Sequence, residues 1–271
     1  MSTIIDYIKA IMAEYKKDNV PILAAAQAYY YLLSIVPLLV VCFAIIPYLH
    51  MDPNEVMLFL EDVLPSGIAE IFEENIVNII QTPKGGLLTI GIIGALWSAS
   101  KGVDAFIKAT NEAYGVDETR SFIKIKGIAL LLTVGVVVSF AVALLLPVFG
   151  NVILTLLNNL FQIDTSIVIV LQLMRWVIGI LAITLILLVL YRVAPNKKLP
   201  IKHILPGALS ASTLWLLISL GFSFYVSNFG SYSTTYGSLG GIIILMIWFY
   251  LTGLILMIGA EINVIHHRRQ T

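Results

Sequence analysis

Long apolar stretches alternate with short polar segments along this chain of 271 residues. A helix needs about 20 predominantly apolar residues to cross about 30 Å of hydrocarbon. Five stretches reach that length, and they cover residues 20–49, 128–149, 167–191, 205–226 and 239–265. The pattern therefore predicts an all-α integral membrane protein in which each of these stretches is a transmembrane helix.

A sixth apolar stretch, residues 86–103, has two interpretations. It contains only 15 residues before Lys101, which is short of the usual range of about 17–25, so it is either a short span or a re-entrant segment. With six spans and a cytoplasmic N-terminus, fourteen of the sixteen basic residues fall on the cytoplasmic side, only Lys84 falls outside and Arg175 lies within a span. The positive-inside rule favours this asymmetry. We therefore predict six transmembrane helices with both termini in the cytoplasm.

The remaining segments predict helices at the membrane surface. Residues 1–19 place apolar side chains at helical spacing with lysines opposite, which predicts a cytoplasmic amphipathic helix. Residues 50–85 form the largest external loop, and their helical periodicity, broken by Pro65-Ser66-Gly67, predicts external amphipathic helices. No linker separates a soluble part, so residues 1–271 are expected to form a single membrane domain.

Composition narrows the possible functions. The chain is 59% hydrophobic and 12% charged, with a mean hydropathy of +0.96, whereas an ordinary soluble domain carries about 25% charged residues. This excludes intrinsic disorder and a nucleic-acid-binding surface. The net charge of zero divides across the predicted topology into +6 in cytoplasmic segments and −7 in external segments, with Arg175 inside the membrane.

Ionisable residues within predicted spans are candidates for function because they are costly in hydrocarbon. Arg175, in the fourth span, either contacts an anionic compound or lipid headgroups, or reaches the outer interface and pairs with the acidic external loop. Glu261, near the inner end of the last span, either pairs with cytoplasmic lysines or forms a proton or cation site. Asn263 is expected to add an oxygen to such a site.

Small and polar residues supply further candidates. Pro37, with Ser34 one turn before it, predicts a kink in the first span, and Tyr30 stands at its cytoplasmic entrance. Residues 230–241 are polar but uncharged, and they form either a compact external turn or a loop that contacts substrate. Tyr236 is a candidate for contact with substrate. Gly237, Gly240 and Gly259 are candidates for close helix packing.

The chain lacks the motifs of several catalytic classes. It has no P-loop, no GxSxG and no HExxH, and its four histidines are not spaced as metal ligands. We therefore predict no catalytic residue, no metal, no cofactor and no enzyme activity. A nuclease is disfavoured because the acidic residues of the segment after the second span are expected to pair with nearby basic residues. These acidic residues are Asp104, Glu112, Asp117 and Glu118, and their expected partners are Lys101, Lys108 and Arg120.

Three blocks of sequence resemble the YihY/BrkB family of bacterial inner-membrane proteins. The first is Ala24-Ala25-Ala26-Gln27-Ala28-Tyr29-Tyr30-Tyr31, continuing to Leu39; the second comprises Trp97–Gly102 and Asn111–Val116; the third comprises Tyr236–Gly241, Trp248–Leu251 and Gly259–Asn263. The resemblance covers nearly the whole chain and implies a six-helix protein of the bacterial cytoplasmic membrane. The family also carries an old ribonuclease label, which nothing in this sequence supports, a virulence label and suggestions of transport.

These observations lead to a functional hypothesis with an alternative. The hypothesis is a transporter or flippase-like protein for an amphiphilic or anionic envelope compound, without ATP hydrolysis of its own. The alternative is a structural or scaffolding protein of envelope assembly. A membrane enzyme acting on lipid headgroups would need a nucleophile or metal set that the chain lacks. The expected partners are membrane lipids, an anionic or amphiphilic substrate and envelope proteins, with no nucleic acid.

Overall fold

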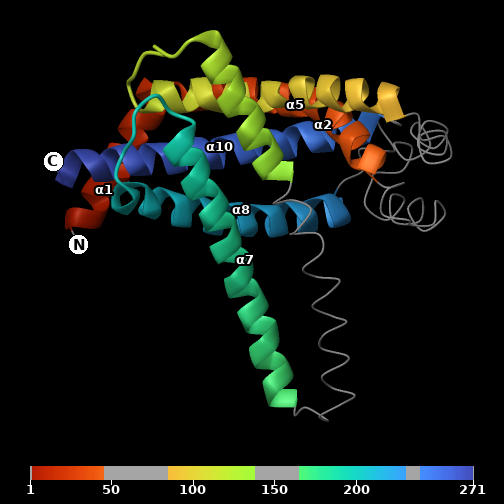
Figure 1. Ribbon diagram of the computed structural model, residues 1–271. Helices are drawn as coiled ribbons and strands as arrows, with labels where there is room; N and C mark the ends of the chain where they lie inside the picture. The colour runs from red at the N-terminus through yellow and green to blue at the C-terminus, as the bar shows by residue number, and fades with distance from the viewer. Residues whose placement is uncertain (1, 46–84, 138–164, 230–238, 271) are drawn as a thin grey trace.

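The computed structural model describes residues 2–45, 85–137, 165–229 and 239–270, and within these residues the chain is helical with short connections and no strand (Figure 1). The all-α prediction is therefore confirmed for the described residues. The predicted external helices before Gly85, and the site candidates Tyr236 and Gly237, lie outside them. The labelled helices are α1 (Ser2–Lys17), α2 (Val20–Ile45), α5 (Gly85–Ala113), α7 (Thr165–Val193), α8 (Ile201–Phe229) and α10 (Leu239–Gln270). A further helix, without a label, spans residues 122–137.

Two of the described helices are long and apolar enough to cross a membrane. They are the Ile201–Val226 part of α8 and the whole of α10, Leu239–Gln270; shorter apolar helices run over Val20–Ile35 and Val177–Val193. Helix α5 runs unbroken through Lys101, so the predicted short span and the segment after it form one helix. The number of spans and their orientation remain predictions.

The helices are arranged around α10. Helix α10 packs against α2 and α8, α5 packs on α2, and α7 crosses α8 and projects away from the bundle (Figure 1). Helix α1 lies on the C-terminal part of α10, where the Tyr7 hydroxyl donates a hydrogen bond to the Ile262 carbonyl (3.3 Å). Both ends of the described chain consequently lie at the same end of the bundle (Figure 1).

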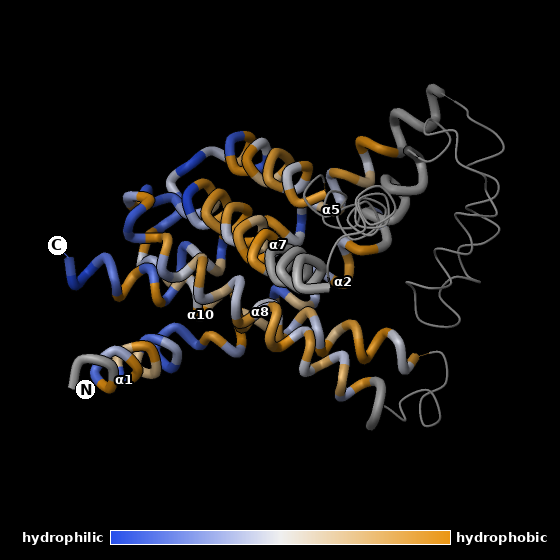
Figure 2. The backbone as a smooth tube through the Cα atoms, turned by 90° about the horizontal axis from the view of Figure 1, so that it is seen from below, coloured by the Kyte–Doolittle hydropathy of each residue, from blue (hydrophilic) through white to orange (hydrophobic). Residues whose placement is uncertain are grey.

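The outer faces of the helices are apolar. Side chains such as Ile22, Leu131, Leu185, Leu217 and Phe224 are more than half exposed. Figure 2 shows hydrophobic residues along the helices and hydrophilic residues gathered toward the end where the termini lie. Soluble proteins rarely expose apolar patches of more than a few hundred Å². This distribution is typical of a protein surrounded by lipid.

Small and polar residues fill the contacts between helices, as expected where lipid removes the hydrophobic drive for helix association. A Cβ atom on Gly207 of α8 would overlap the Gly259 carbonyl and the Asn263 side chain of α10, and a Cβ on Gly259 would overlap the Tyr191 hydroxyl. The hydroxyls of Thr184 and Ser212 join α7 to α8 at 2.7 Å. Helices α8 and α10 can therefore approach closely because Gly207 and Gly259 have no side chain.

We expect Gly207→Ala to destabilise the protein by about 1–3 kcal/mol, because the added methyl group must displace packed backbone and side-chain atoms. Gly221→Ala, on the same helix, is the matched control: its Cβ would meet nothing within 4 Å, and alanine favours a helix over glycine by up to about 1 kcal/mol. Thermal unfolding in detergent measures both variants. Equal melting temperatures for the two would contradict the packing assignment.

Candidate functional site

Three acidic side chains converge where α1 meets α10. Glu14 and Asp18 are one helical turn apart, and Asn19 follows with a left-handed backbone (φ 49°) that ends the turn between α1 and α2. Asparagine tolerates this conformation better than most residues. On α10, Glu261 and Arg268 lie two turns apart and share a face. Packing α1 on α10 therefore brings Glu14, Asp18 and Glu261 together.

The geometry of this acidic cluster is close. One carboxylate oxygen from each of Glu14, Asp18 and Glu261 lies within 4.8 Å of the other two. Glu261 is 0% exposed, and neither of its carboxylate oxygens has a hydrogen-bond partner among the described residues. Lys17 Nζ contacts Glu14 Oε2 at 2.9 Å and Asp18 Oδ1 at 3.4 Å. The described structure therefore places lysine on the rim of the cluster, and Glu261 forms no ion pair with it.

Glu14 is the charge-balanced member of the cluster. Its second oxygen, Oε1, accepts a hydrogen bond from Arg268 Nη1 at 2.6 Å. The hydrogen bond from Lys17, together with that from Arg268, lowers the pKa of Glu14 despite its partial burial. Glu14 is thus held as a carboxylate, and the contact with Arg268 fastens α1 to the end of α10.

Asn263 makes its described hydrogen bonds away from Glu261. Its Oδ1 accepts the Gly207 N–H at 2.9 Å, and its Nδ2 donates to the Tyr114 hydroxyl at 3.5 Å. Residues two apart on a helix do not face each other, so Asn263 and Glu261 point to different neighbours. In this structure Asn263 joins α10 to α8, and its described hydrogen bonds go to Gly207 and Tyr114.

The candidates on α2 lie apart from the acidic cluster. Ser34 is buried; its Oγ donates to the Tyr30 carbonyl at 2.6 Å and accepts the Gly102 N–H of α5 at 3.1 Å. Tyr30 is 37% exposed. Helix α2 begins at Val20, just after Asp18, and Ser34 lies fourteen residues further along it, which at 1.5 Å per residue is about 21 Å. Helix α2 continues through Pro37, and Ser34 serves the α2–α5 contact.

The other candidates either pack between helices or have side chains outside the described part of the structure. Gly240 is buried at the start of α10, and Gly259 lies at the close contact with α8 and Tyr191. Arg175 belongs to α7, but its side chain is not among those described. The structure accordingly brings none of the remaining described candidates to Glu261. The sequence did not predict that Glu14 and Asp18 lie near Glu261. Their spacing shows only that they share one face of a helix, and not which helix packs against that face.

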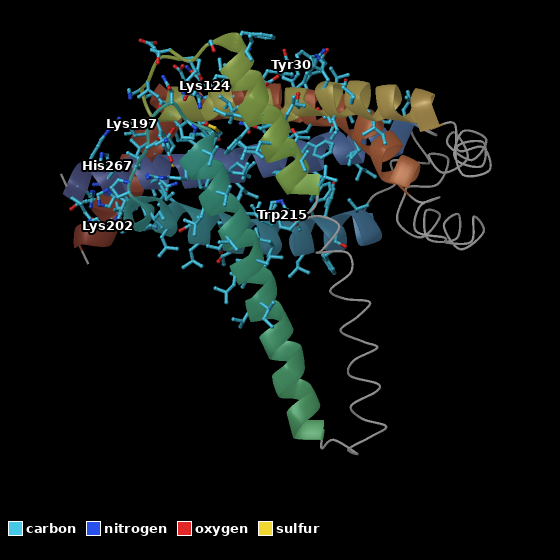
Figure 3. All side chains as sticks on the ribbon, viewed as in Figure 1. Tyr30, Lys124, Lys197, Lys202, Trp215 and His267 are labelled. Carbon is cyan, nitrogen blue, oxygen red and sulfur yellow. The ribbon has the colours of Figure 1, made fainter. Side chains whose placement is uncertain are left out.

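A cavity of about 220 Å³ lies beside the acidic cluster. It is lined by Tyr114, Gly115, Lys197, Leu199, Val264, His267 and Arg268. Figure 3 shows Lys197 and His267 at the end of the bundle where the termini lie, with Lys202 nearby. Arg268 lines the cavity and also binds Glu14. Arg268 therefore links the cavity to the acidic cluster.

The loops around this basic cavity are fixed by hydrogen bonds. Helix α5 ends in a Schellman motif: the Gly115 N–H donates to the Glu112 carbonyl (2.9 Å), the Val116 N–H donates to the Asn111 carbonyl (3.0 Å), and Gly115 has φ 61°. The Asn111 side chain accepts the Asn196 N–H at 2.7 Å. This contact ties the end of α5 to the α7–α8 connection, which carries Lys197.

Glu118 strengthens the same loop. It accepts hydrogen bonds from Arg120 Nη2 at 2.6 Å and from Asn111 Nδ2 at 2.9 Å, and Arg120 also donates to the Ala194 carbonyl at 2.8 Å. The Arg120 contact is the main cause that lowers the pKa of Glu118 to about 2. The expected pairing of Glu118 with Arg120 is present.

Two further contacts were not expected from the sequence. Asp104 pairs with Lys126 at 2.9 Å, which lies on the helix over residues 122–137 and was not among its expected partners. The Nδ1 atom of His267 lies 2.7 Å from Nδ1 of the buried His203 on α8. Both contacts join residues that are distant in sequence.

Comparison with known proteins supports the family resemblance that the three sequence blocks indicate. The sequence model of the family described as Virulence factor BrkB matches residues 11–271. This chain belongs to the BrkB family. The match includes Glu14, Asp18, Lys197 and Glu261, so the acidic cluster and the basic cavity both lie inside the family region.

Two relatives show how far the similarity of this BrkB protein extends. A Bacillus subtilis protein named as ribonuclease-like, YfkH, is 39% identical over 264 residues, which is 97% of this chain and 96% of the relative. A UPF0761 membrane protein of Photobacterium profundum is 31% identical over 270 residues, which is 96% of this chain and 80% of the relative. No solved structure matches. The resemblance to the YihY/BrkB family is confirmed, and the chain is a membrane protein.

The loop at Glu118 makes a pH-dependent contribution to stability. Because folding lowers the pKa of Glu118 from 4.5 to about 2, this contribution is present above about pH 4.5 and is lost as the pH falls toward 2. We expect the melting temperature of the wild type to fall more steeply between pH 6 and pH 3 than that of Glu118→Gln. Glu112→Gln, at an exposed carboxylate on α5, should fall like the wild type. Parallel curves for wild type and Glu118→Gln would contradict the assignment.

Proposed function

We propose that this BrkB-family protein is a multi-pass protein of the bacterial cytoplasmic membrane that moves an anionic amphiphile of the envelope between leaflets, without hydrolysing ATP itself. The observation that carries the proposal is the basic cavity. Lys197, His267 and Arg268 supply hydrogen-bond donors, whereas Tyr114 and Leu199 supply apolar surface. Phosphate and carboxylate groups bind such donors strongly, and basic pockets at the cytoplasmic side of membrane helices suit anionic headgroups.

The orientation of the cavity supports a cytoplasmic headgroup site. Six spans with cytoplasmic termini put fourteen basic residues on the inner side, as the positive-inside rule favours. The cavity lies at the end of the bundle that carries both termini (Figures 1 and 3). A headgroup in the cavity would thus come from the inner leaflet, while its acyl chains lie along the apolar outer faces of the helices.

Arg268 offers a way to link headgroup binding to movement of α1. Arg268 is one of the residues that line the cavity, and its guanidinium donates to Glu14. An anion in the cavity competes with Glu14 for this donor, and a ligand that favours one arrangement of Arg268 shifts the protein toward it. Binding would then loosen the contact between α1 and α10.

One observation favours the alternative of a structural or scaffolding protein. The cavity reaches Val264, but Glu261, three residues earlier on α10, does not line it and is fully buried. A transport path in this conformation would have to open further. The ribonuclease-like name of the Bacillus relative is no part of either proposal, because Glu118, an acidic residue of the loop after α5, is already bound by Arg120 and Asn111.

Reconstitution into liposomes tests the transport proposal. We expect the protein to move fluorescent phosphatidylglycerol between leaflets faster than in empty vesicles. Lys197→Glu should slow this about tenfold or more, since one hydrogen bond to a charged group contributes about 1.5–3 kcal/mol. Lys124→Glu makes the same charge change at another exposed lysine (Figure 3) and should leave the rate unchanged. No movement of anionic lipid above empty vesicles, under several ion gradients, would overturn the proposal and favour the scaffold.

A further inference from the structure

The acidic cluster leaves a defined set of carboxylate oxygens without partners. Lys17 and Arg268 occupy both oxygens of Glu14, and Lys17 also contacts Asp18 Oδ1. The oxygens that remain are Asp18 Oδ2 and both oxygens of Glu261, which are buried and have no hydrogen-bond partner among the described residues. Glu261 is 0% exposed, and its carboxyl group points into the cluster. These three oxygens are therefore open to a bound cation or to a proton.

We propose that Glu14, Asp18 and Glu261 bind a hard divalent metal cation between α1 and α10. An uncompensated carboxylate is strongly disfavoured in a buried position. Carboxylate oxygens are the donors that hard divalent cations prefer. This site is separate from the proposed headgroup cavity, and it stands whether or not the protein transports lipid.

The charges of the cluster favour binding of a cation. When ionised, Glu14, Asp18 and Glu261 carry three negative charges, against the two positive charges of Lys17 and Arg268, whose side chains are 62% and 50% exposed. The Asp18 side chain is only 8% exposed and Glu261 is fully buried. A cation bound between these two buried carboxylates offsets their mutual repulsion.

The spacing of the three oxygens fits a hard divalent cation. One carboxylate oxygen from each residue lies within 4.8 Å of the other two. This upper limit on their separation accommodates both Ca²⁺, which binds oxygen at about 2.3–2.6 Å, and Mg²⁺, which binds it at about 2.0–2.1 Å. Water supplies the remaining ligands.

The cation would hold a surface helix on the membrane bundle. Helix α1 contacts α10 through the Tyr7 hydroxyl on the Ile262 carbonyl, through Arg269 over the Tyr7 ring (4.8 Å) and through Arg268 with Glu14. A metal ion joining Glu14 and Asp18 to Glu261 adds a bond that is buried and therefore less screened by salt. Metal binding should accordingly stabilise the folded protein.

The test uses the full-length protein in detergent after removal of metal ions. Equilibrium dialysis with radioactive Ca²⁺ should give one site per chain, for which excess Mg²⁺ competes, and added Ca²⁺ should raise the melting temperature by several degrees. Glu261→Gln should reduce Ca²⁺ affinity at least tenfold and abolish the rise. Because this variant removes a buried charge, it should melt at or above the temperature of the metal-free wild type, so a failure to fold does not confuse the result.

Controls separate the metal from a proton. Asp18→Asn should weaken Ca²⁺ binding, and Glu112→Gln, at an exposed carboxylate outside the cluster, should bind as the wild type does. The proposal is overturned if millimolar Ca²⁺ and Mg²⁺ neither bind nor change the melting temperature. It is also overturned if the stability depends on pH alone and this dependence disappears in Glu261→Gln, because a proton then occupies the cluster. Neither measurement depends on lipid movement, so a failed transport assay leaves this result intact.

Discussion

Polar groups between the helices of this protein must be satisfied by one another, because the outward faces are apolar and offer no hydrogen bonds. Several contacts between the helices meet this constraint. Thr184 pairs with Ser212, the Tyr191 hydroxyl donates to the Leu256 carbonyl at 2.7 Å, and Asn263 accepts the Gly207 N–H. These bonds require close helix approach, which Gly207 and Gly259 permit. Packing and polar pairing are therefore one requirement in this fold.

Glu261 is the conspicuous departure from that requirement. It lies on the same helix as Asn263, yet its carboxylate has no partner among the described residues. Its neighbours are two further acids and, through Arg268, a cavity lined by basic residues. The acidic cluster and the basic cavity thus share one end of the bundle and one residue, Arg268. The predicted topology places this shared end in the cytoplasm, and we propose that it is the functional centre of the protein.

The sequence predicts the local features of this structure and misses those that depend on tertiary contacts. Apolar length and periodicity predict α1, α2, α8 and α10, and the cost of a charge in hydrocarbon singles out Glu261. The convergence of Glu14 and Asp18 on Glu261 joins residues more than 240 positions apart. It requires α1 to fold back on α10, which no local pattern encodes. The contact of Asn263 with Gly207 could not be predicted for the same reason. The sequence shows on which face of a helix a residue lies, but not which neighbouring helix packs against that face.

Cysteine labelling with a membrane-impermeant maleimide tests whether the end of the bundle that holds the acidic cluster and the basic cavity faces the cytoplasm. In a Cys42→Ala background, Lys198→Cys beside the cavity and Gln270→Cys at the end of α10 mark the shared end, and Asn54→Cys marks the predicted external loop. The account predicts that intact cells label only Asn54→Cys, and that Lys198→Cys and Gln270→Cys react after permeabilisation. Labelling of Lys198→Cys or Gln270→Cys in intact cells would contradict it, because the acidic cluster and the basic cavity would then face outward.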